Sequence, residues 1–173
     1  AAGEDRVALC DRCSYAANLE LAAYRRAEPP RGDGKEREAV HTPGRRTIDE
    51  VGDFLGLLAE RMIKCLMYLV EGRPVAVLVP GDREANETKL ARVFGTDEFR
   101  LFREDDWERF PGLLQGFVGP VGLDAIEVVA DNYLQGAGGM ACGANRADFH
   151  LVNVEEGRDF TVHRFADVTT ARE

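Results

Sequence analysis

The chain of 173 residues is poor in the residues that usually build nucleophilic and metal sites. It contains one serine, Ser14, and three histidines, His41, His150 and His163. Because Ser14 is not part of a Gly-x-Ser-x-Gly turn, the sequence has no nucleophile elbow of the kind found in serine hydrolases. The histidines also lack the His-x-x-x-His spacing with which one helix binds zinc.

The four cysteines do not form a zinc motif either. Cys10 and Cys13 make a single Cys-x-x-Cys pair, whereas a structural zinc site needs four ligands, usually two such pairs or a pair with histidines. We therefore expect no metal and reduced, unliganded thiols. Cys65 and Cys142 could act as nucleophiles with His150 as the base, but nothing in their spacing supports this over burial as small apolar side chains.

Long hydrophobic runs and an excess of basic residues are also missing. No apolar stretch reaches the roughly 18 to 20 residues of a membrane span. Residues 1–6 have neither the basic start nor the apolar core of a signal peptide, so we expect a cytoplasmic protein with no membrane partner. The formal net charge of -9 argues against a general nucleic-acid-binding surface, although a tether can still deliver such a domain to nucleic acid.

The sequence does contain an unusual charge inside an apolar run. Lys64 is the only charged residue in residues 62–70, and a turn signal follows at residues 71–74, which predicts a buried strand. Because an unpaired buried charge is costly, the ammonium group either reaches water or faces a polar cavity. His150 presents a similar choice, between a core residue and a site residue, and the residues themselves leave both choices open.

The order of the helix and strand patterns predicts an α+β fold with a mixed, largely antiparallel sheet and surrounding helices. Thr47 and Glu50 form a capping box at the start of one helix. We expect helices at residues 16–24, 48–58, 87–94 and 104–110, and strands at residues 7–9, 62–70, 74–80, 99–102, 125–130, 149–154 and 160–165.

Composition divides the chain into three parts. Residues 1–24 form a first segment, and residues 25–46 are charged and broken by proline and glycine, which predicts a linker. The globular domain is expected to span residues 47–173. Within it, residues 111–123 and 136–143 are glycine-rich and match no phosphate-binding motif. They are either ordinary loops or loops whose backbone N–H groups approach a ligand.

A series of short motifs occurs along the chain in a fixed order. They are Gly3-Glu4-Asp5, Cys10-Asp11-Arg12-Cys13-Ser14-Tyr15-Ala16-Ala17-Asn18, His41-Thr42-Pro43-Gly44, Thr47-Ile48, Ile63-Lys64, Gly81-Asp82-x-Glu84-x-Asn86, Gly116-x-x-Gly119-Pro120, Cys142-Gly143-Ala144-Asn145 and Asp148-Phe149-His150. In this order they resemble the editing insertion of bacterial prolyl-tRNA synthetases, a member of the YbaK-like deacylase superfamily.

The resemblance implies post-transfer editing, in which alanine is hydrolysed from a mischarged proline tRNA. Alanine is smaller than proline, so a synthetic pocket for proline cannot strongly reject it. A second site can admit alanine and exclude proline by size. The implied partners are alanine-carrying tRNA(Pro) and the parent synthetase domains in cis. Because residues 3–18 resemble the synthetase body, we expect an excised domain without the aminoacylation site. ATP and magnesium belong to that body, and editing needs no cofactor.

The resemblance also implies the residues of the site. Lys64 matches a functional lysine, which we expect to orient the aminoacyl-adenosine end or its phosphate. Ile48 and Val51 match positions that line the pocket for the alanyl methyl group, and His150 matches a residue that shapes it. The loop beside the pocket supplies Gly116, Gly119 and Pro120, and we expect the backbone N–H groups of residues 116–119 to face the developing oxyanion. Three further residues of the matched motifs are predicted to bind substrate: Asn86, Gly143 and Asn145.

Two departures from the family pattern bear on specificity. Val51 is smaller than the leucine often found at its position, and Cys65 stands where threonine is common. Two alternatives of other kinds remain: a non-catalytic module that positions tRNA, and a free-standing YbaK-like deacylase for cysteinyl-tRNA. The synthetase-like segment at residues 3–18 argues against the second.

Overall fold

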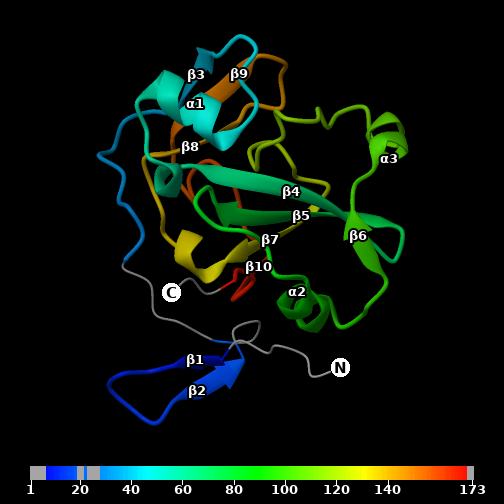
Figure 1. The fold of residues 1–173 in the computed structure, drawn as a ribbon. Coiled ribbons are helices and arrows are strands. Elements are labelled where there is room, and N and C mark those ends of the chain that lie inside the picture. The colour runs from blue at the N-terminus through cyan, green and yellow to red at the C-terminus, as the bar shows by residue number, and fades with distance from the viewer. Residues whose placement is uncertain (1–6, 19–21, 23–27, 171–173) are drawn as a thin grey trace.

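A computed structural model describes residues 7–18, 22 and 28–170 (Figure 1). Near the N-terminus, β1 (Val7–Leu9) and β2 (Ala16–Asn18) form a two-stranded antiparallel sheet of their own. The rest of the described chain contains a five-stranded sheet, a three-stranded sheet and three α-helices. The predicted α+β fold class is confirmed.

The five-stranded sheet has the order β10-β7-β5-β4-β6. The hairpin of β4 (Ile63–Val70) and β5 (Arg73–Pro80) forms its middle, and its register pairs Lys64 with Val79. Glu71 and Gly72 both have positive φ, which matches the tight turns that suit hairpin twist. The outer strands are β6 (Phe99–Leu101), β7 (Glu127–Asp131) and β10 (Arg164–Ala166). Because β7 runs parallel to both β5 and β10, the sheet is mixed, as predicted.

The three-stranded sheet has the order β3-β9-β8 and is antiparallel. Its strands are β3 (Glu38–His41), β8 (Met140–Gly143) and β9 (Phe149–Val154). The main apolar core lies between the two sheets, where Leu78 and Val128 pack in one cluster with Met140 and Val154. A bridge between Met62 and Ala141 joins the sheets at the start of β4. This junction places β8 beside the open edge of β4.

The first two helices begin at the capping residues that the sequence predicts. α1 (Ile48–Leu55) begins at the predicted Thr47 capping box and ends at Gly56 in the left-handed conformation. α2 (Glu87–Phe94) begins at Asn86, whose side chain accepts a hydrogen bond from the Lys89 N–H. α2 and the three-stranded sheet lie on opposite sides of the five-stranded sheet (Figure 1). α3 (Glu104–Arg109) follows β6, and two 3₁₀ turns, η1 (Ala59–Arg61) and η2 (Asn132–Leu134), complete the elements.

Several expected boundaries are wrong. Residues 25–46 are not a linker throughout, because β3 pairs with β9 over four residues. The helix expected at residues 16–24 is wrong at its start, which is strand β2, and most of its remainder lies outside the described residues. The glycine cluster at residues 136–143 is a loop only in its first half, since β8 occupies the second. The strand expected at residues 160–165 is the shorter β10, which starts at Arg164.

The capping box makes a testable contribution to stability. Replacing Thr47 by alanine removes the side-chain acceptor of the Glu50 N–H and is expected to cost about 1 kcal/mol. For a domain of this size the midpoint of thermal unfolding should fall by roughly 2–4 °C. Thr161→Ala is the matched control, because Thr161 is exposed and outside any helix. Equal midpoints for the two variants would show that the cap does not stabilise α1.

Candidate functional site

A pocket of about 810 Å³ opens between α1, the first half of β4, the ends of β8 and β9, and the loop after α3. Its lining joins segments that are far apart in the sequence. Six of the predicted site residues line it: Ile48, Val51, Lys64, Gly116, Gly143 and His150. Four predicted residues do not line it: Asn86, Gly119, Pro120 and Asn145.

One end of the pocket is apolar. Ile48 and Val51 lie on the same face of α1 and pack in one cluster with Met62. Val51 is almost fully buried, with 1% of its surface exposed. Gly81 completes this end, because a Cβ there would lie 2.4 Å from the Ala59 carbonyl oxygen. This end of the pocket is therefore lined by closely packed apolar side chains, with backbone approaching at Gly81.

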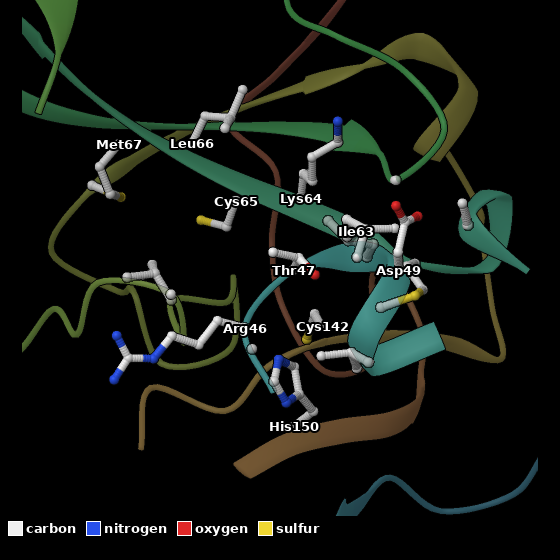
Figure 2. A pocket seen from close by; sticks show the side chains of 18 of the residues that line it. Arg46, Thr47, Asp49, Ile63, Lys64, Cys65, Leu66, Met67, Cys142 and His150 are labelled. Carbon is white, nitrogen blue, oxygen red and sulfur yellow. The ribbon is translucent and has the colours of Figure 1, made fainter. Parts of the chain in front are cut away.

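Lys64 lies at the rim of the pocket. Its Nζ is 2.5 Å from Glu84 Oε1, and its side chain is 18% exposed whereas that of Glu84 is 77% exposed. Figure 2 shows Lys64 and Cys65 on opposite sides of β4, with only Cys65 directed toward Cys142 and His150. This follows from the alternation of side chains along a strand. The ammonium group therefore pairs with a carboxylate at the edge of the pocket.

His150 lies on the floor of the pocket and is buried. Its Nδ1 is hydrogen-bonded with Thr42 Oγ1 at 2.7 Å, and Thr42 is itself fully buried. Burial lowers the pKa of His150 below its usual value, so the ring is neutral near neutral pH. With one nitrogen held by Thr42 and no charge, His150 is suited to shape the pocket. Thr42 belongs to a matched motif, but only the fold shows that it contacts His150.

Two glycines explain how the loop after α3 reaches the pocket. A Cβ on Gly119 would lie 1.9 Å from the Gly143 carbonyl oxygen, and one on Gly143 would lie 2.3 Å from the Phe117 carbonyl oxygen. Both clashes involve backbone, so the loop can approach β8 this closely only with glycine at both positions. Gly119 and Gly143 therefore place the loop against the sheet.

Asn145 stabilises this contact between the loop and β8 with hydrogen bonds. Its backbone N–H donates to the Phe117 carbonyl, its Nδ2 donates to the carbonyls of Gly119 and Val121, and its Oδ1 accepts from the Gly119 N–H. Asn145 also has a positive φ, which asparagine tolerates better than most residues. The structure thus gives Asn145 a role in holding the loop, and gives Asn86 a role in capping α2.

Of the two pocket cysteines, Cys142 is buried and Cys65 is half-buried. Burial raises the pKa of Cys65 to about 12 and raises that of Cys142 as well. Both thiols face the same space below β4 (Figure 2). Because the thiolate is the nucleophile, these residues contribute apolar surface and not a reactive group.

The sequence did not point to the aromatic wall or the second cation of the pocket. Phe102 and Trp107 line one side, with ring centroids 5.1 Å apart. Asp106 anchors α3 here, because its hydrogen bond from Arg100, at 2.5 Å, holds the pKa of its carboxyl down at about 2. Arg46 is the second cation, and it lines the pocket beside Gly116. The one sequence signal for the aromatic wall was that Trp107 is the only tryptophan of the chain.

Two general searches returned nothing within the described part of the chain. Across residues 7–18, 22 and 28–170, no three or more histidine, cysteine, aspartate or glutamate side chains are grouped so that they could hold a metal ion. Over the same residues, no helix is long and apolar enough to cross a membrane.

Comparison with known proteins identifies the family. The family model of the aminoacyl-tRNA editing domain matches residues 42–160. Over 99% of its length the chain is 38% identical to a proline–tRNA ligase of Halothermothrix orenii and 40% identical to one of Aquifex aeolicus, and it spans about 30% of each ligase. The chain belongs to the aminoacyl-tRNA editing domain family, and the predicted resemblance to the prolyl-tRNA synthetase editing domain is confirmed.

Solved structures agree on the fold. A hypothetical protein matches with a TM-score of 0.64 and 25% identity over 79% of this chain and 93% of its own. A candidate trans-editing enzyme for prolyl-tRNA synthetase matches with a TM-score of 0.61 and 21% identity over 78% of this chain and 87% of its own. The fold of this chain is therefore shared with solved proteins of 21–25% sequence identity.

The cysteine environments predict two classes of thiol. With a pKa of about 12, Cys65 is a thiolate only to about one part in ten thousand at pH 8. Cys10 and Cys13 are exposed, and hydrogen bonds lower the pKa of Cys10. Iodoacetamide at pH 8 should modify Cys10 and Cys13 quickly, Cys65 much more slowly because of its raised pKa, and the buried Cys142 only on unfolding. Peptide mass mapping over time measures this, and labelling of Cys65 as fast as that of Cys10 would contradict its raised pKa.

Proposed function

We propose that this domain hydrolyses the ester of alanine wrongly attached to a proline tRNA, acting in cis with the other domains of a proline–tRNA ligase. The observation that carries the proposal is the apolar cluster of Ile48, Val51 and Met62 that lines the pocket of an aminoacyl-tRNA editing domain. The likeness to proline–tRNA ligases supports the choice of tRNA.

Size explains the selection of alanine. We propose that the compartment at α1 accepts a methyl group, whereas the larger proline ring would press against the buried Val51 side chain. A pocket of this kind discriminates by roughly 10- to 200-fold for each added methylene group. The rest of the 810 Å³ is left for the terminal adenosine, whose base can stack on the wall that includes Phe102 and Trp107.

Hydrolysis then needs an oriented ester and donors for the oxyanion. In the loop, the Gly119 N–H already donates to Asn145 and the Phe117 N–H to the Leu114 carbonyl. Among the described residues, the amides of Gly116 and Val118 carry no protein hydrogen bond, and both residues line the pocket. We assign these two amides to the oxyanion, in place of the wider range of residues 116–119 expected from the sequence.

Lys64 orients the aminoacyl-adenosine end from the rim. Glu84 holds its ammonium group in place, and its three N–H donors can reach hydroxyl groups of the substrate ribose. His150 is buried and held by Thr42, so we propose that the ribose hydroxyl beside the ester positions the attacking water by a hydrogen bond. As water adds to the carbonyl and the ester bond breaks, the leaving ribose oxygen takes up the proton that the water loses. The tRNA thus supplies part of the chemistry itself.

The test compares deacylation of alanyl-tRNA(Pro) and prolyl-tRNA(Pro) under single-turnover conditions. The domain should hydrolyse the alanyl ester about 100-fold faster, and Lys64→Ala should slow this reaction by about 100-fold, because it removes an oriented donor. Lys35→Ala is the matched control, since Lys35 also pairs with a carboxylate but lies outside the pocket.

Two results would count against the proposal. Hydrolysis of both esters at equal rates would refute the size selection. Full activity in the Lys64→Ala protein would refute the role of that residue while leaving the size selection standing. Binding of alanyl-tRNA(Pro) without hydrolysis would favour the non-catalytic, tRNA-positioning alternative.

A further inference from the structure

Arg46 carries a positive charge at the pocket that the protein leaves available. It lies between β3 and α1 and lines the pocket. Within residues 7–18, 22 and 28–170, no aspartate or glutamate forms an ion pair with its guanidinium group. Its aromatic neighbour is Phe117, whose ring centroid lies 5.4 Å from the guanidinium carbon. In a chain with a net charge of -9, such a cation is notable.

Contacts of the backbone, the stem and the guanidinium group place Arg46 beside the pocket. Its backbone N–H donates to Glu50 Oε2, which also serves the capping box of α1. The aliphatic stem runs beside Gly116, where a Cβ would lie 3.2–3.4 Å from the Arg46 carbons. The guanidinium group then rests over Phe117. The stem and the guanidinium group thus each have a contact beside the pocket, and these contacts favour the side-chain conformation that faces the glycine loop.

The two pocket cations differ in what they can offer a ligand. Lys64 already contacts Glu84 at 2.5 Å, so its charge is largely compensated. Arg46 has no such partner among the described residues, and its planar guanidinium matches two phosphate oxygens at once. Figure 2 shows its side chain directed away from His150, toward the glycine loop. The uncompensated charge thus lies away from the pocket floor.

The substrate chemistry identifies the anion. With the ester in the pocket, the first negative group along the nucleic acid is the phosphate on the 5′ side of the terminal adenosine. We infer that Arg46 binds this phosphate, while Lys64 contacts the ribose. The inference rests on the proposed function, which places an esterified adenosine in the pocket, and it adds the residue that recognises the nucleic-acid backbone.

The experiment uses two non-hydrolysable ligands that differ only in one phosphate. They are 3′-alanylamino-3′-deoxyadenosine and the same compound with a 5′-phosphate, and isothermal titration calorimetry measures both dissociation constants. The wild-type domain should bind the phosphorylated ligand about tenfold more tightly at low salt, and this advantage should shrink as salt is raised. In Arg46→Gln the advantage should fall below about twofold.

Matched variants distinguish phosphate binding by Arg46 from a general effect of positive charge near the pocket. Arg45→Gln removes the neighbouring charge, which lies over Phe54 and outside the pocket lining, and should keep most of the phosphate advantage. Arg46→Lys should keep part of it, because the charge remains but the paired donors are lost. The inference fails if the wild type binds both ligands equally or if Arg46→Gln keeps the advantage.

The two proposals can fail separately. A domain that does not hydrolyse alanyl-tRNA(Pro) would refute the proposed function, whereas the ligands of this experiment are amides and are not hydrolysed. A phosphate advantage that depends on Arg46 would then still establish a nucleotide site. Active hydrolysis without such an advantage would refute only the role of Arg46.

Discussion

The pocket depends on the close backbone contact between Gly119 and Gly143. No side chain fits at either position, because Cβ atoms would meet backbone at 1.9 and 2.3 Å. Asn145 fixes the contact with its hydrogen bonds to the loop. The contact brings the amides of Gly116 and Val118 to the same space as α1 and β4. Without it, the loop of Gly116 and Val118 would not line the pocket beside α1 and β4.

Charge is organised locally in a protein that is acidic overall. Lys64 is compensated by Glu84, and Arg46 is supported by Phe117 without a carboxylate among the described residues. The net charge of -9 makes weak, salt-sensitive binding of tRNA the expectation for the isolated domain. In a proline–tRNA ligase, the other domains would supply the missing affinity for tRNA, because tethering raises the effective concentration of the tRNA near the editing domain.

Local signals explain what the sequence could predict. The capping box at Thr47, the cap at Asn86 and the β4–β5 hairpin each depend on residues a few positions apart, and all were found. Strand β3 was missed because its residues are mostly exposed and it is defined by pairing with β9, more than 100 residues away. The Gly119–Gly143 contact and the position of Arg46 in the pocket could not be predicted for the same reason, because both depend on segments far apart in the sequence. The resemblance to a known family, and not spacing, brought Lys64, Ile48, Val51 and His150 together.

The most direct test of this account is the deacylation rate of Gly119→Ala beside that of Gly112→Ala. Gly112 lies in the same loop, and a Cβ there would meet nothing within 4 Å. The account predicts that Gly119→Ala keeps the circular dichroism of the folded sheets, loses roughly 1–3 kcal/mol of stability to overpacking and hydrolyses alanyl-tRNA(Pro) at least about tenfold more slowly. Gly112→Ala should match the wild type. Wild-type deacylation by Gly119→Ala would contradict the account.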